Sequence, residues 1–164
     1  MTARAVLFAL DADDADRLLA CQDDDERNRL VGEIEERWEE DHLCELDKSW
    51  DAMHRCLTDG NLAYGNGDFP LSHVILGGEP LHDDGDDYIV CHVPAEQVPE
   101  VAAALEPLDG QWLRERFTTL TFDDYEGTGD ADDIAYTVAF LPDLKDFYRA
   151  AAQNGRAVIF TVDQ

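Results

Sequence analysis

The sequence is short of positive charge, and of lysine in particular. Lys and Arg together number 12 against 38 Asp and Glu residues, giving a formal net charge of −26 at pH 7, and the lysines are Lys48 and Lys145. Because a negative field of this size repels phosphate groups, we expect no binding to nucleic acid or to anionic membrane surfaces. A partner selected by charge is then a basic protein, although acidity of this kind also serves solubility alone.

Cysteine motifs and long apolar runs are absent as well. The four cysteines, Cys21, Cys44, Cys56 and Cys91, include no C-x-x-C pair and no pair at zinc-finger spacing. The first apolar run stops after Leu10, which makes it too short for a signal peptide or a membrane span. We therefore expect a cytoplasmic protein whose thiols are reduced.

Signatures of catalysis and of ligand binding are also missing. The patterns G-x-S-x-G, H-E-x-x-H and Walker A do not occur. The acidic loop that begins at Asp124 resembles a calcium loop in its first positions, but Ala135 stands where a bidentate Glu is needed. The glycines between residues 59 and 85 lie among acids without a Lys or Arg nearby, so they predict turns rather than a phosphate site. We predict neither a metal ion nor a cofactor.

What is present is the pattern of one α+β domain that covers residues 1–164. Apolar runs rich in β-formers predict strands at residues 3–10, 87–93 and 156–162, and the first of these is apolar on both faces, as in a buried central strand. Helical periodicity occupies much of the chain between the strands, including residues 46–58. We expect a small mixed β-sheet of three or more strands, packed by about five helices.

The segment ELDKSWDAMHRCLTDG, residues 45–60, holds the strongest helical signal. Asp47 stands where an N-cap belongs and Gly60 where a glycine follows the helix. One stripe of this helix carries Leu46, Trp50, Met53 and Leu57, so the pattern predicts a core-facing helix. His54 borders that stripe, which predicts a partly buried histidine whose ring nitrogens bond to backbone or carboxylate groups.

The same helix also permits a functional interpretation. His54 can act as a general base oriented by Asp47 or Asp51, beside the rare Lys48. Cys56 lies two residues from His54 and points elsewhere, so helix geometry disfavours a His-Cys catalytic pair. The candidate pocket comprises Asp47, Lys48, Trp50 and His54 from the helix, with Tyr64 and His73 from the glycine-rich loop.

Two groups of residues give the chain a family resemblance. The motif L-D-K-x-W-x-x-x-H-x-x-L-T is matched by Leu46, Asp47, Lys48, Trp50, His54, Leu57 and Thr58, and a closing aromatic-Ala-Ala-x-x-Gly pattern by Tyr148, Ala151, Ala152 and Gly155. In the order of these motifs the chain resembles the YfbM-like family, small bacterial proteins classified as a domain of unknown function. The resemblance implies an α+β fold and no particular activity. Residues 121–133 depart from the aromatic-Pro signature that the family tends to carry, because they contain no proline.

Two functional hypotheses follow from these observations. The first is a non-catalytic binding protein that sequesters a basic partner, in the manner of an immunity protein, and its support is the net charge of −26. The second is a small enzyme or ligand-binding protein with a cleft beside residues 46–58, in which His54 and Lys48 carry the chemistry. A cavity shared by these two side chains would distinguish the second hypothesis from the first.

Overall fold

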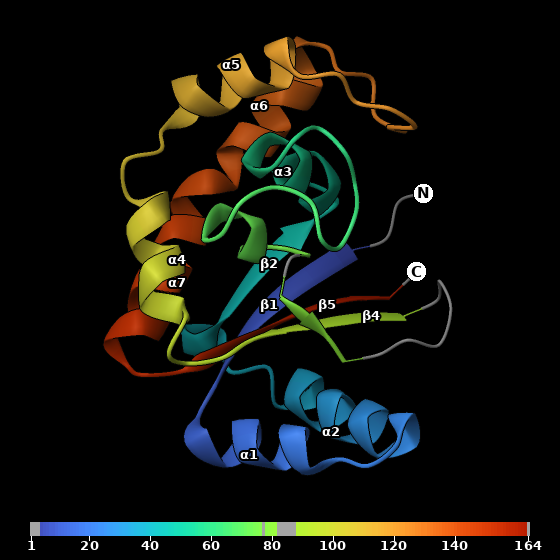
Figure 1. Ribbon diagram of the computed structural model, residues 1–164, viewed down its shortest axis with the longest axis vertical. Helices are drawn as coiled ribbons and strands as arrows, with labels where there is room; N and C mark the ends of the chain where they lie inside the picture. The colour runs from blue at the N-terminus through green and yellow to red at the C-terminus, as the bar shows by residue number, and fades with distance from the viewer. Residues whose placement is uncertain (1–3, 77, 82–87, 164) are drawn as a thin grey trace.

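A five-stranded antiparallel sheet lies between two layers of helices (Figure 1). The computed structural model describes residues 4–76, 78–81 and 88–163. The strand order is β2-β1-β5-β4-β3, where the strands are β1 (Arg4–Leu10), β2 (Leu43–Asp47), β3 (Glu79–Pro80), β4 (Tyr88–Val93) and β5 (Ala157–Asp163). Each neighbouring pair runs antiparallel. The predicted α+β class is confirmed, whereas the expectation of a mixed sheet is wrong.

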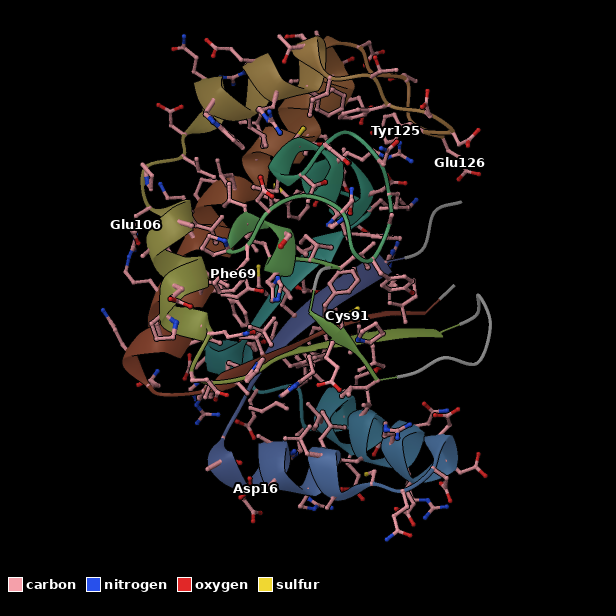
Figure 2. All side chains as sticks on the ribbon, in the orientation of Figure 1. Asp16, Phe69, Cys91, Glu106, Tyr125 and Glu126 are labelled. Atoms are coloured by element: carbon pink, nitrogen blue, oxygen red, sulfur yellow. The ribbon has the colours of Figure 1, made fainter. Side chains whose placement is uncertain are left out.

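The helices divide unequally between the two faces of the sheet (Figure 1). One face is covered by α1 (Ala12–Ala20) and α2 (Asp24–Arg37), and Asp16 projects from α1 away from the sheet (Figure 2). The other face carries α3 (Trp50–Leu57), α4 (Val98–Leu105), α5 (Gly110–Thr119), α6 (Ala131–Ala139) and α7 (Leu141–Gln153). Single turns of 3-10 helix lie at η1 (Glu40–His42) and η2 (Leu71–His73). No helix in the described ranges is both long and apolar enough to cross a membrane.

The central strands are buried on both faces because their side chains alternate between two cores. On β1, Leu7 belongs to the core beneath α3–α7, whereas Phe8 belongs to the core above α1 and α2. On β5, Phe160 and Ile159 divide in the same way. The predicted strands at residues 3–10, 87–93 and 156–162 are confirmed within the described residues, which exclude 3 and 87.

The predicted helix over residues 46–58 is wrong at its beginning. Residues up to Asp47 form the edge strand β2, and the helix begins at Trp50 with Ser49 at its N-cap position. Asp47 is no cap, because it pairs with Ala5 of β1 and has a left-handed backbone with φ of 48°. Leu46 is buried as the spacing suggested, but it is buried from a strand, so pairing with β1 overrides the local helical pattern.

Helix α6 was not predicted as an element separate from α7. It begins after Asp130, whose side chain accepts a hydrogen bond from the Asp133 backbone N–H at 2.9 Å. This N-cap ends the acidic loop at Asp130, although polar residues continue to Asp133 in the sequence. The described chain therefore holds seven α-helices, where about five were predicted.

Candidate functional site

His54 is a structural residue in this fold. Its side chain is wholly buried, deeper than the partial burial that its place beside the stripe suggested. Nδ1 accepts a hydrogen bond from the Leu76 backbone N–H at 3.4 Å, so the ring proton lies on Nε2. Nε2 in turn donates to Ala63 O and Asn66 Oδ1, each at 2.9 Å. Both nitrogens thus join α3 to the following loop, and burial lowers the pKa of the ring.

The other predicted pocket residues do not gather around His54. Lys48 is exposed, and Trp50 is buried against Phe160 with ring centroids 5.8 Å apart. Tyr64 is exposed on the loop after α3, and His73 is half-buried. The main cavities of the described residues are lined by neither His54 nor Lys48. Among the described residues, His54 and Lys48 therefore share none of these cavities.

Asp47 and Lys48 instead meet helix α6 at the end of β2. The Tyr136 hydroxyl donates to Asp47 Oδ2 at 2.7 Å and accepts from the Lys48 backbone N–H at 3.2 Å. Asp47 Oδ1 also lies 3.2 Å from Arg4 Nε. Tyr136 in turn packs edge-on against Phe140, with ring centroids 5.1 Å apart. These contacts fix the end of β2 relative to the beginning of α7.

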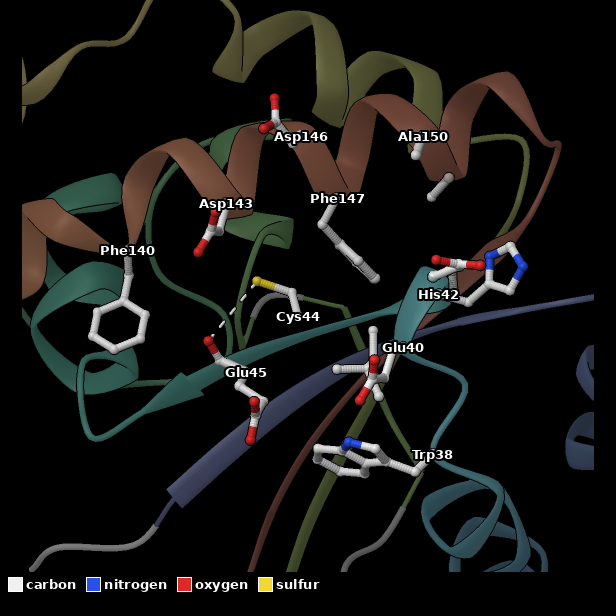
Figure 3. A pocket seen from close by; sticks show the side chains of 14 residues that line it. Trp38, Glu40, His42, Cys44, Glu45, Phe140, Asp143, Asp146, Phe147 and Ala150 are labelled. Atoms are coloured by element: carbon white, nitrogen blue, oxygen red, sulfur yellow. Dashed lines mark hydrogen bonds between the residues drawn. The ribbon is translucent and has the colours of Figure 1, made fainter.

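A groove lies where α7 overhangs the edge strand β2 (Figure 3). It has a volume of about 530 Å³, with η1 and β2 on one side and α7 on the other. Its lining includes five carboxylates and three aromatic rings, namely Glu40, Asp41, Glu45, Asp143, Asp146, Trp38, Phe140 and Phe147. No Lys or Arg of the described chain lines it. We call this feature the acidic groove.

Local structure places each wall of the acidic groove. The alternation of β2 turns Cys44 inward and Glu45 outward. Spacing of four residues places Asp143 and Phe147 on the same side of α7. Trp38 ends α2 in a left-handed conformation with φ of 43°, and its indole packs edge-on against Phe8. Because Trp38 remains 38% exposed, part of this ring is open to the groove.

The negative charge of the groove is largely uncompensated. Among the described residues only Asp146 of the five carboxylates has an ion pair, with Arg149 at 2.8 Å. Burial, and then the charges of Asp143 and Glu45, raise the pKa of the Cys44 thiol to about 12. This thiol is therefore no nucleophile near neutral pH. The carboxylates do not form a metal site either, since no three His, Cys, Asp or Glu side chains of the described ranges are grouped to hold an ion.

Carboxylates beside aromatic faces are suited to cationic groups. Guanidinium and ammonium groups form charge-assisted hydrogen bonds with carboxylates, and they bind over aromatic rings. Sequence reasoning missed this site because 38 acidic residues give no signal for the few that converge. Their convergence depends on α7 lying beside β2, about a hundred residues earlier in the chain.

The known proteins that this chain resembles have the same fold, and their descriptions name no activity. A family described as a domain of unknown function (DUF1877) matches residues 1–161. The crystal structure of YfbM from Escherichia coli, described as a protein of unknown function, has a TM-score of 0.68 and 20% sequence identity, and the match covers 97% of this chain and 99% of that chain. No curated protein matches the chain. The resemblance to the YfbM-like family is confirmed.

Proposed function

This chain belongs to the DUF1877 family of domains of unknown function, and we propose that it is a non-catalytic protein that binds a basic segment of a partner protein. The observation that supports this function is the acidic groove, where five carboxylates and three aromatic rings surround about 530 Å³ and no Lys or Arg is found among the described lining residues. A positively charged side chain of the partner would compensate the negative charge of these carboxylates. The net charge of −26 would also attract such a partner over a distance and accelerate its association.

Several modest contacts would together give useful affinity. An ion pair at an exposed site contributes about 0.2–1 kcal/mol, and a cation over an aromatic ring about 0.5–2 kcal/mol. Two Arg side chains that each meet a carboxylate and a ring would then contribute about 1.4–6 kcal/mol, which is a factor of ten or more in affinity. A segment with several cations is therefore the expected ligand, rather than a single small cation.

Solubility is the competing explanation of the acidic composition. Acids that serve solubility alone have no reason to converge around a cavity that also exposes Trp38. The two explanations differ in what happens when equal charge is removed from different places. Binding through the groove depends on where the acids lie, whereas a general charge effect depends only on how many there are.

The test compares two triple variants by isothermal titration with tetra-arginine at about 0.15 M salt, where distant charges are screened. The groove variant carries Glu40→Gln, Glu45→Gln and Asp143→Asn. Its matched control on the α1–α2 layer carries Asp16→Asn, Asp25→Asn and Glu36→Gln, three exposed acids whose removal changes the net charge equally. We expect the groove variant to lose about tenfold or more in affinity and the control less than about twofold. Equal losses in both variants, or no binding by the wild type, would contradict the proposal.

A further inference from the structure

One wall of the acidic groove is the free edge of the sheet. Strand β2 comes first in the strand order, and among the strands that the structure describes it pairs with β1 alone. Outside the ladder, no backbone–backbone hydrogen bond within the described ranges involves residues 43–45. Farther along, Leu46 O is occupied, because the Ser49 backbone N–H donates to it at 3.0 Å. An edge strand presents outward N–H and C=O groups, so residues 43–45 can pair with a further strand.

The two edges of the sheet differ in how they are protected. Strand β3, at the opposite edge, has two residues, and one of them is Pro80. Shortness and proline both discourage the addition of a strand there. Strand β2 has five residues and no proline, and its outward-facing charge is Glu45. Glu45 opposes an acidic neighbour and favours a basic one, so this edge is selective rather than closed.

We propose that the partner's basic segment binds in an extended conformation as a sixth strand beside β2, within the acidic groove. This inference rests on the proposed function and adds the way in which the segment is held. A partner strand that matches the five residues of β2 spans about 17 Å. Its successive side chains point to opposite faces of the sheet, so basic residues placed at every second position all meet the same face of the groove.

The two faces of such a strand would meet different walls of the groove. Phe147 extends from α7 toward the strand, and the Asp143 carboxylate is directed toward β2 (Figure 3). Glu45 and Trp38 lie on the side of β2 away from α7 (Figure 3). Each face therefore offers a carboxylate and an aromatic ring to alternate side chains of the incoming segment.

A second copy of this chain is the competing occupant of the edge. Pairing of β2 with another β2 would bring two chains of net charge −26 together and place Glu45 beside acidic groups of the other copy. Like charges that face each other across strands oppose pairing. The charge of the groove thus selects a basic segment over self-association.

The experiment separates backbone pairing from charge. The probe is the peptide Ac-KTRTKTR-NH2, and its control is the same peptide with every backbone amide N-methylated, which keeps the charges but removes the N–H donors. Full-length protein is titrated with each peptide, and amide hydrogen exchange of residues 43–45 is followed. We expect the unmethylated peptide to bind about tenfold more tightly and to slow exchange at those of these amides that point away from β1, because each backbone hydrogen bond adds to affinity.

The contrary outcomes are distinct. Equal affinity of the two peptides would overturn strand addition and leave cation binding in the groove intact. Binding by neither peptide would overturn the proposed function together with this inference. Protection of the outward-facing amides of residues 43–45 without peptide, accompanied by a doubled molecular mass in solution, would assign the edge to a second copy and overturn the inference alone.

Discussion

Replacement of Arg55 with methionine tests how the large helical layer is held together. The Arg55 side chain is only 3% exposed. Its Nε donates to Asp51 Oδ1 at 2.6 Å, and its Nη1 donates to Asp123 O at 2.6 Å and to Gly60 O at 3.2 Å. One guanidinium therefore joins α3, the turn after it, and the loop before α6. Because α6 leads directly into α7, these bonds also support a wall of the acidic groove.

Two aromatic rings complete the environment of Arg55. The centre of its guanidinium lies 5.6 Å from the ring centroid of Phe122 and 5.4 Å from that of Tyr125. Tyr125 comes from the acidic loop between α5 and α6 (Figure 2). Its hydroxyl donates to Asp133 Oδ2 at 2.7 Å, which ties the loop to the first turn of α6. The acidic loop that begins at Asp124 is thus anchored on a buried charge.

The expected cost follows from these contacts. Methionine keeps much of the apolar stem but leaves Asp51 and two carbonyl groups without their donor. Removal of one partner from a buried ion pair costs about 3–5 kcal/mol. Contributions from the individual bonds and rings are not added to this figure, because neighbouring interactions are not additive. Since domains of this kind unfold with about 5–15 kcal/mol, the change removes a large fraction of the stability.

The assay is urea unfolding of wild-type protein and of Arg55→Met, with Arg149→Met as the matched control. Arg149 also contacts two carboxylates, Glu106 at 2.7 Å and Asp146 at 2.8 Å, but its side chain is 44% exposed. Exposed pairs contribute about 0–1 kcal/mol, so the control is expected to change the free energy of unfolding by no more than that. A cost for Arg55→Met below about 1 kcal/mol, or equal to that of the control, would refute the reasoning.

Two further predictions concern buried titratable groups. Burial lowers the pKa of His54 and of His92, whose Nδ1 is buried without a hydrogen-bond partner in the described structure. The folded state favours the neutral rings, so their contribution to the free energy of unfolding is complete above about pH 6.5. Acidification removes this contribution, at up to about 1.4 kcal/mol per pH unit for each ring. Urea unfolding at pH 7.5 and pH 5.5 checks this, and equal stabilities would contradict it. Burial also raises the pKa of Cys44, Cys56 and Cys91 to about 12, so roughly one thiol in ten thousand is a thiolate at pH 8. The pKa of Cys21 is also raised by burial, but this thiol is partly exposed, so native protein treated with iodoacetamide should be modified first at Cys21, and equally fast modification of all four cysteines without denaturant would contradict this.

The sequence predicted those parts of the fold that local pattern determines. The apolar runs of β1, β4 and β5 are long enough to indicate strands by themselves. Strand β2 was missed because Leu46 and Trp50 are four residues apart, which fits a helical stripe, although the first lies on a strand and the second on a helix. Only the pairing of residues 43–47 with β1, which is far away in the sequence, distinguishes a strand from a helix at this position.

The candidate site was predicted less well than the fold. His54 is part of the family motif, and its position at the edge of a core stripe was predicted. Its backbone hydrogen-bond partners Ala63 and Leu76 come from segments whose path the sequence does not reveal. The acidic groove needs α7 and β2 to be adjacent, and that is a property of the sheet order. Composition indicated a basic partner, whereas the surface that would bind it required the fold.

Mapping of tetra-arginine binding by nuclear magnetic resonance tests the groove most directly. The indole N–H signals of Trp38 and Trp50 form an internal pair, since Trp38 is 38% exposed at the groove and Trp50 is 6% exposed in the core. At about 0.15 M salt, binding in the groove predicts shifts at the Trp38 indole and at the Glu45 amide, with Trp50 and the Asp16 amide of α1 unchanged. An unmoved Trp38 signal, or shifts at Asp16 as large as those at Glu45, would contradict the account.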